Sequence, residues 1–224
     1  MVVPIRVGTI GAEITALLLS ASCAGCGESG TLLCEVCREQ LTPEPALRHT
    51  PQGLAVWSAL SFEGVAARCI RRLKGEGETL LARPLATALA PILARTLSEG
   101  AAAVPMPTGR AAFRRRGYRV PDLLIRRAGA LPLRVLRDVG GRVDQRGLDA
   151  RERADNVRGA LRARLQGDGL RVVIVDDVIT TGSTMDEGAR VLLAAGFDVL
   201  CGVALAATPM HRKVRDDPWA TRSK

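Results

Sequence analysis

The stretch that decides the fold is Val172-Val173-Ile174-Val175-Asp176-Asp177-Val178-Ile179-Thr180-Thr181-Gly182-Ser183-Thr184. Its first four residues are aliphatic, which is typical of a strand buried on both faces of a parallel sheet. Two aspartates follow at the carboxyl end of that strand, where open α/β sheets bind their ligands. We therefore predict a strand over 171–176 that ends in a binding site.

The polar residues after the strand indicate a ligand with two different ends. Asp176 and Asp177 can accept hydrogen bonds from two neighbouring hydroxyls, such as those of a ribose. The turn at 180–184 offers hydroxyls, a glycine and the free N–H groups of a helix start, which together bind a phosphate dianion. Because carboxylates would repel a phosphate in the same pocket, the spacing predicts a ribose 5-phosphate unit. The alternative is a buried strand whose acidic turn only caps the next helix.

From residue 54 onward the sequence alternates between strand and helix patterns. We predict strands over 54–62, 101–106, 133–136 and 198–206, and helices over 64–74, 79–97, 120–128 and 183–195. The helix over 79–97 is expected to be interrupted at Pro84 and Pro91. The alternation predicts an α/β fold, a doubly wound parallel sheet with helices on both faces.

Composition limits the classes of function. The 224 residues include 32 Lys and Arg against 23 Asp and Glu, a formal charge of +9, and 47% are hydrophobic. These values are typical of a globular protein and exclude a disordered or collagen-like chain. Only Lys74, Lys213 and Lys224 are lysines, which leaves 29 arginines and favours an anionic substrate or partner. The alternative is that most of these arginines are solvated cations of no specific role.

No run of about 20 apolar residues is present, so we expect no membrane span and a cytoplasmic protein. The run at 14–19 before Cys23 resembles a bacterial lipoprotein signal, but it is short and Glu13 precedes it. We therefore favour a different role for Cys23.

Four cysteines form two hooks, Cys23-x2-Cys26 and Cys34-x2-Cys37, separated by seven residues. Two such hooks bring four thiolates to one point, which predicts a structural zinc ion with no open position for catalysis. Disulfides or a redox pair are the alternatives. Cys69 and Cys201 lie in apolar surroundings and are expected to be core residues.

The stretch 172–184 resembles the phosphoribosyl-pyrophosphate (PRPP) signature of type I phosphoribosyltransferases. The resemblance implies that Asp176 and Asp177 hold the ribose hydroxyls. It also implies that the 5-phosphate is cradled by the residues of the turn, namely Thr180, Thr181, Gly182, Ser183 and Thr184.

The order of motifs over about residues 10 to 208 is similar to that of ComF/GntX proteins. The motifs are the cysteine hooks, Leu73-Lys74, 104–107, Arg116-Gly117, Gln145, Glu152-Arg153, Asn156 and the signature. Relatives of this kind are linked to competence for DNA uptake in some bacteria. One departure matters, because the usual Arg-Gly-Phe-Asn-Gln reads Arg-Gly-Tyr-Arg-Val at 116–120. If the lost Asn and Gln orient a substrate, this protein binds a different one or binds it less well.

The resemblance also assigns two loops. The pyrophosphate loop would comprise Met106, Pro107, Thr108 and Arg110, aided by Arg114 to Arg116, unless those arginines form only a solvated basic face. The flexible catalytic loop would span 142–156 and contribute Gln145, Arg153 and Asn156. Lys74 would contact pyrophosphate or, alternatively, favour the dipole of its helix.

Three prolines at 43, 45 and 51 mark a linker near 42–53. We expect an N-terminal helix and zinc module over 1–45 that serves as a hood, a phosphoribosyltransferase domain over 54–210, and a polar tail over 211–224. The implied reaction is transfer of the 5-phosphoribosyl group from magnesium-bound PRPP to a nucleobase-like nitrogen acceptor. The alternative is a non-enzymatic PRPP sensor, or a protein of the competence machinery that binds nucleic acid. The sequence does not decide between a monomer and a homodimer.

Overall fold

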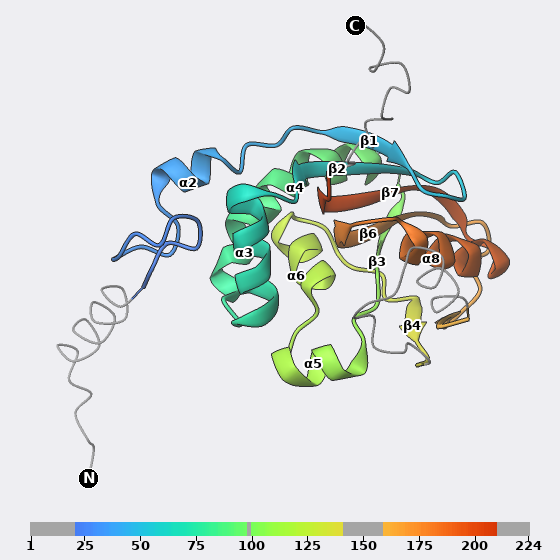
Figure 1. The fold of residues 1–224 in the computed structure, drawn as a ribbon. Helices are drawn as coiled ribbons and strands as arrows, with labels where there is room; N and C mark the ends of the chain where they lie inside the picture. The colour runs from blue at the N-terminus through green and yellow to red at the C-terminus, as the bar shows by residue number, and fades with distance from the viewer. Residues whose placement is uncertain (1–20, 98–99, 141–158, 210–224) are drawn as a thin grey trace, which may run out of the picture.

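The computed structural model describes residues 21–97, 100–140 and 159–209. Within these ranges, one sheet has five strands in the order β1-β2-β7-β6-β3 (Figure 1). Their bounds are β1 Ala46–His49, β2 Ala55–Ser61, β3 Ala102–Pro105, β6 Arg171–Ile179 and β7 Asp198–Ala207. β2, β7, β6 and β3 run parallel, whereas β1 pairs antiparallel with β2.

Helices cover both faces of this sheet. The helices are α3 Gly64–Gly75, α4 Ala82–Leu97, α6 Val120–Arg127 and α8 Ser183–Ala194. Val173 and Val175 of β6 belong to the core formed with α3, α4 and α6. Val172 and Ile174 belong to the core formed with α8 on the other face, because successive residues of a strand alternate between faces. The predicted α/β sheet with helices on both faces is confirmed, with one antiparallel edge strand.

The segment predicted as a linker contains β1 in its middle. Ala46–His49 is mostly exposed and shows no hydrophobic alternation, so its sequence carries no strand signal. It is a strand because its backbone pairs with β2 from Ala46↔Ser58 to His49↔Ala55. Such pairing is a long-range contact that a local pattern does not report.

The predicted interruption of the helix over 79–97 is wrong. A short 3-10 turn, η1 Thr79–Leu81, leads into α4, which runs unbroken through Pro91. Pro84 lies in the first turn, where its missing N–H has no intrahelical partner to lose. Ile92 and Leu93 next to Pro91 are almost fully buried, and this packing holds the helix together.

The same helix is long and apolar enough to cross a membrane by length and composition, with a mean hydropathy of 1.3 over its most apolar window. In the fold, however, α4 packs against β2, β7 and α6. Leu85 and Leu89 are fully buried in the core, and Ile92 and Leu93 nearly so. These contacts are those of a central core helix.

Several other elements were not predicted at these positions. The short helices α2 Glu35–Glu39 and α5 Arg110–Arg116 lie in stretches with few apolar residues. β4 Leu136–Asp138 lies further along than the predicted strand over 133–136, and pairs antiparallel with β5 Leu161–Ala163. β6 runs to Ile179, three residues past the predicted end.

The four-cysteine region packs onto the rest of the molecule. Cys23, Cys37 and Leu41 are buried in the same core as α3 and α4. Arg72 of α3 donates from Nη1 to the carbonyl of Ser22 at 3.0 Å. Figure 1 shows α2 beside α3 at one end of the sheet. The N-terminal region is therefore joined to α3, which ends at Gly75, by a hydrogen bond and by a shared core.

Candidate functional site

Asp176 and Asp177 lie within β6, because the strand continues to Ile179. Asp177 N–H donates to Asp176 Oδ1 at 2.8 Å. Asp177 is buried, with 7% of its surface exposed, whereas Asp176 is half-buried. Neighbouring residues of a strand point to opposite faces. The two acids are therefore adjacent in the chain but differ in their surroundings.

Lys74 is the partner of the buried acid. Its Nζ lies 2.9 Å from Asp177 Oδ1, although the two residues are 103 positions apart in the sequence. Lys74 stands in the last turn of α3, which places its ammonium near the helix C-terminus as well. The ion pair with Asp177 was not predicted from the sequence. No local signal could reveal it, because the contact depends on where the tertiary fold places the end of α3, which packs on α4 and β2, relative to the acids of β6.

The phosphate-binding turn joins β6 to α8. Gly182 has φ +87° and forms the N-cap, and no side chain at that position caps the helix. Thr181 Oγ1 and Ser183 Oγ lie 3.1 Å apart, and Thr180 is exposed beside them. The turn thus presents hydroxyls and the first amides of a twelve-residue helix, which is the arrangement that binds phosphate groups.

The hairpin between β1 and β2 is hydrogen-bonded to the first turn of α8, directly after the phosphate-binding turn. Thr50 donates from its hydroxyl to Asp186 in the first turn of α8 and accepts the N–H of Leu54 at 3.0 Å. The backbone N–H of Gln52 donates to the other carboxylate oxygen of Asp186 at 3.2 Å. Thr50 is itself buried. These positioning contacts were also missed, because they join residues 136 positions apart.

A cavity of about 630 Å³ opens at the carboxyl end of β3. Met106 N–H donates to the carbonyl of Val175 at 2.8 Å, so the loop after β3 lies beside the strand segment that carries the two acids. The cavity is lined by Pro105, Met106, Pro107, Thr108, Arg110, Arg119, Asp122, Arg134, Leu136, Arg137, Asp138 and Arg164. All four residues expected to form a pyrophosphate loop are in this lining. None of residues 176–184 is in it.

The cavity is strongly basic. Its lining has five arginines against two aspartates, a difference of +3. Asp122 is buried and pairs with Arg134, and Asp138 accepts the N–H of Gly140 at 2.9 Å. The Arg119 guanidinium lies over the Phe113 ring, 4.3 Å from its centre. Such a lining can bind a multiply charged anion through charge-assisted hydrogen bonds.

Three of these arginines are available to a ligand. Arg110, Arg137 and Arg164 are exposed, and none of them has an ion pair or hydrogen bond with another side chain in the described part of the chain. Arg137 and Arg164 come from the β4 and β5 segments, which were not predicted to lie beside the loop after β3. The expected catalytic residues Gln145, Arg153 and Asn156 lie outside the described residues.

The strands β4 and β5 flank the segment that contains those catalytic candidates. The N–H of Val139 donates to the carbonyl of Ala160 at 2.9 Å. The N–H of Gly159 donates to Oε1 of Glu187 at 2.8 Å, and Glu187 is buried on α8. Arg190 holds the same carboxylate through two bonds of 2.7 and 2.9 Å. Val139 and Gly159, the described residues that flank this segment, are therefore hydrogen-bonded to Ala160 and to α8 respectively.

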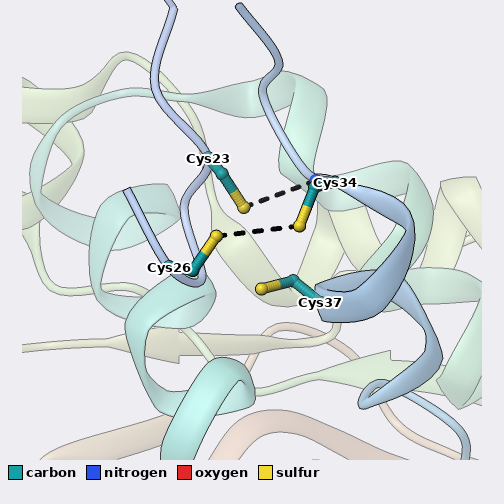
Figure 2. Close-up of side chains that lie close together, drawn as sticks. All are labelled: Cys23, Cys26, Cys34 and Cys37. Carbon is teal, nitrogen blue, oxygen red and sulfur yellow. Dashed lines mark hydrogen bonds between the residues drawn. The ribbon is translucent and has the colours of Figure 1, made fainter. Parts of the chain in front are cut away.

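The four cysteines of the two hooks come together as predicted. Their sulfur atoms all lie within 4.8 Å of one another, and Figure 2 shows them directed toward a common centre. Cys26 Sγ and Cys34 Sγ are 3.7 Å apart. Four sulfurs at about 2.3 Å from a tetrahedral zinc ion are about 3.8 Å from each other, so the cluster fits that ion.

Backbone amides favour the thiolate form at one of these positions. Burial alone raises the pKa of Cys23, but backbone hydrogen bonds, including those from Gly25 and Cys34, outweigh it and lower the pKa to about 6. Both of these amide bonds to Cys23 Sγ measure 3.4 Å. Thiolates are the form that zinc binds. All the cysteines are free thiols, and Cys69 is buried in the core as expected.

Sequence comparison identifies the family. The phosphoribosyl transferase domain family matches residues 111–224, just over half of the chain. DNA utilization protein YhgH of Salmonella typhi is 40% identical over 87 residues, which cover 37% of this chain and 38% of that protein. Competence protein F of Haemophilus influenzae is 35% identical over 105 residues, which cover 43% and 46%. The matched stretches span less than half the length of these relatives.

Solved structures are more distant. A crystal structure of the adenine phosphoribosyltransferase from Saccharomyces cerevisiae is 14% identical and has a TM-score of 0.41. The matched region covers 78% of this chain and 89% of the yeast chain. The family assignment therefore rests on the sequence match and on the four-cysteine cluster. The chain belongs to the phosphoribosyl transferase domain family, and its cysteine cluster and its similarity to YhgH and competence protein F fit a ComF-type member with a zinc module.

Proposed function

We propose that this protein binds PRPP and transfers its 5-phosphoribosyl group to a nitrogen acceptor, with release of pyrophosphate. The observation that carries the proposal is the arginine-lined cavity formed by the loop after β3, beside the strand that bears Asp176 and Asp177. A sugar bound at this end of β6 would extend its 5-phosphate toward the turn at 180–184 and its pyrophosphate toward this cavity. Support for this arrangement comes from the position of the three groups of residues toward the carboxyl ends of β6 and β3, which is where such folds bind ligands.

In the reaction, a nitrogen of the acceptor forms a bond to C1 of the ribose while the bond from C1 to pyrophosphate breaks. The bonding electrons leave on the pyrophosphate oxygen, and the proton of the nitrogen passes to solvent. Positive charge develops on the sugar and negative charge on the leaving group. The arginines of the cavity would stabilise the leaving group, and the turn and the acids would hold the sugar in position.

Two metals belong to the proposal. The tight cluster of four sulfurs supports a structural zinc ion held by Cys23, Cys26, Cys34 and Cys37. Magnesium would neutralise part of the pyrophosphate charge when PRPP binds, and Asp176 is a carboxylate at the site that could hold it through water. Coordination by all four cysteines leaves no position for a substrate, so the zinc ion would stabilise the fold and take no part in the transfer.

Calorimetric titration with PRPP and magnesium tests the binding step, and pyrophosphate release with a panel of nucleobases tests transfer. We expect Asp176→Asn to weaken PRPP binding by about tenfold or more, because a charge-assisted bond to the ribose is lost. Asp198→Asn is the matched control, since Asp198 is exposed at the opposite end of the neighbouring strand β7. Binding without pyrophosphate release from any base would leave a PRPP sensor. Absence of binding by the wild type would refute the proposal.

Nucleic-acid binding is a second candidate function. The relatives named for DNA utilization and competence favour it, and so does the formal charge of +9. Contacts of arginine with phosphates would make this binding steeply salt-dependent. We expect binding of single-stranded DNA to survive Asp176→Ala with Asp177→Ala if it uses a surface separate from the sugar site. No binding at low salt would remove this candidate.

A further inference from the structure

The end of α3 is anchored before any ligand binds. Leu73 is fully buried in the core, and its carbonyl accepts a hydrogen bond from the Tyr118 hydroxyl. One residue earlier, Arg72 donates to the carbonyl of Ser22 and pairs with Glu78. The last carbonyls of a helix have no partner within it, so these contacts decide where the helix end lies. Lys74, the next residue, is consequently held in a defined place.

Tyr118 is suited to this anchoring role. Burial raises the pKa of its hydroxyl, while the nearby Arg116 acts in the opposite direction. The phenol therefore stays protonated at neutral pH and acts as a donor. Tyr118 directly precedes Arg119, which lines the basic cavity. The same connection between α5 and α6 thus contributes to the cavity and to the position of Lys74.

The ammonium of Lys74 gives Asp177 a fixed orientation. The side chain of Asp177 is 10% exposed and that of Lys74 is 34% exposed. A buried carboxylate without a partner is costly, and a bond to a cation both offsets this cost and selects one rotamer. The bond uses Oδ1, so a ribose hydroxyl would be accepted at Oδ2. Lys74 is not among the residues that line the basic cavity.

We infer that Lys74 is a positioning residue for the sugar subsite, which holds Asp177 ready to accept a ribose hydroxyl and does not itself bind pyrophosphate. The inference rests on the proposed function. It assigns the ion pair between Lys74 and Asp177 a role in recognising the ribose part of the ligand. A lysine that contacted pyrophosphate directly would instead recognise the leaving group.

The test compares ligands with and without the sugar. Dissociation constants for PRPP, ribose 5-phosphate and inorganic pyrophosphate are measured by calorimetry for the wild type, Lys74→Met and Lys74→Arg. We expect Lys74→Met to raise the dissociation constants of PRPP and ribose 5-phosphate by about tenfold or more. The dissociation constant of pyrophosphate should stay within about twofold of the wild-type value. Lys74→Arg, which keeps the charge, is expected to restore most of the sugar affinity. Arg68→Met, at an exposed position of the same helix, is the matched control.

A double-mutant cycle separates positioning from general damage to the fold. If Lys74 acts through Asp177, adding Asp177→Asn to Lys74→Met changes PRPP affinity much less than it does in the wild type. Melting temperatures identify any variant that has lost its fold, and the cycle then uses Lys74→Gln, which also removes the charge, in place of Lys74→Met. Additive effects in the cycle would overturn the inference.

The outcomes also distinguish the inference from the proposed function. A wild type that binds none of the sugar phosphates contradicts the proposed function. If the wild type binds PRPP and Lys74→Met binds it with the same affinity, only the role of Lys74 is contradicted. Loss of pyrophosphate affinity equal to the loss for PRPP would place Lys74 at the leaving group instead, and would equally overturn the inference.

Discussion

Gly182 passes Thr50 so closely that a Cβ atom at position 182 would lie 2.6 Å from Thr50 Cγ2. Gly182 also has φ +87°, a backbone conformation that side chains rarely adopt. Thr50 in turn is held by Asp186 of α8. The phosphate-binding turn is therefore packed directly against the hairpin between β1 and β2. Its conformation depends on a segment more than 130 residues earlier in the chain.

This packing predicts a large effect of Gly182→Ala. We expect a loss of stability on the order of 2 kcal/mol from left-handed strain and overpacking, seen as a lower denaturant midpoint. Binding of inorganic phosphate should be lost with it, because the turn must move. Gly129→Ala is the control, since Gly129 has φ +89° but nothing within 4 Å of a Cβ. Equal losses in the two variants would show that the contact with Thr50 is unimportant.

The same contact predicts a partial rescue. Thr50→Ser removes Cγ2 and keeps the hydroxyl that bonds Asp186. In the Gly182→Ala background, this second change should recover part of the lost stability, because the closest clash is with that methyl group. Thr50→Ser in the wild type should destabilise by about 1 kcal/mol, the size of one buried methyl group. A double variant no more stable than Gly182→Ala alone would contradict this account.

The cysteine cluster predicts one zinc ion per chain. Metal analysis should show that Cys26→Ser or Cys37→Ser lowers the zinc content, whereas Cys201→Ser, outside the cluster, leaves it unchanged. Loss of the ion should lower the melting temperature by several degrees, because Cys37 is buried in the same core as α3. Full zinc content in the cluster variants would argue against tetrahedral coordination by all four sulfurs.

Glu187 predicts a defined pH dependence of stability. Burial by itself raises the pKa of Glu187, but the bonds from Arg190 and Gly159 outweigh it and bring the pKa below the ordinary value of 4.5. A carboxylate with a lowered pKa stabilises the fold above its unfolded value and loses this contribution as the pH falls through its folded value. At neutral pH, Glu187→Gln should cost about 2 kcal/mol in unfolding free energy.

The difference between the wild type and Glu187→Gln should shrink as the pH drops below about 4. Chemical denaturation at pH 7, 5 and 3.5 measures this directly. Glu44→Gln, at an exposed position, should show no such trend. A difference that stays constant from pH 7 to pH 3.5 would mean that the ion pair with Arg190 is not responsible.

The basic cavity predicts that its exposed arginines, of which Arg137 is one, contribute to the affinity for pyrophosphate. Arg137→Ala should weaken binding of inorganic pyrophosphate by about tenfold and reduce its salt dependence, because an exposed guanidinium at the cavity is removed. Arg127→Ala is the control, an exposed arginine of α6 outside the lining. Equal effects of the two changes would indicate only a general attraction to a basic surface.

Much of the fold could be predicted from local pattern. The aliphatic run at 172–175 indicated the buried strand β6, and the alternation around it indicated helices on both faces, because burial on both sides requires unbroken apolar runs. The spacing of the two CxxC hooks indicated the cysteine cluster, since two residues of separation let both sulfurs face one point. These features depend on residues close together in the sequence.

The elements that were missed depend on distant partners. β1 has no strand pattern of its own and exists through its pairing with β2. α4 continues through Pro91 because buried neighbours hold it. The pairing of β4 with β5 brings Arg137 and Arg164 to one cavity, which neither stretch indicates alone.

The sequence by itself determined the chemistry that is present: two acids, a glycine turn with hydroxyls, an excess of arginine and four cysteines in two hooks. Only the tertiary structure decided how these groups are used, because packing selects which charges meet. It pairs Lys74 with Asp177, sets Thr50 against Gly182 and gathers five arginines around one cavity. Each of these contacts joins segments that are far apart along the chain, so no local sequence pattern predicts it.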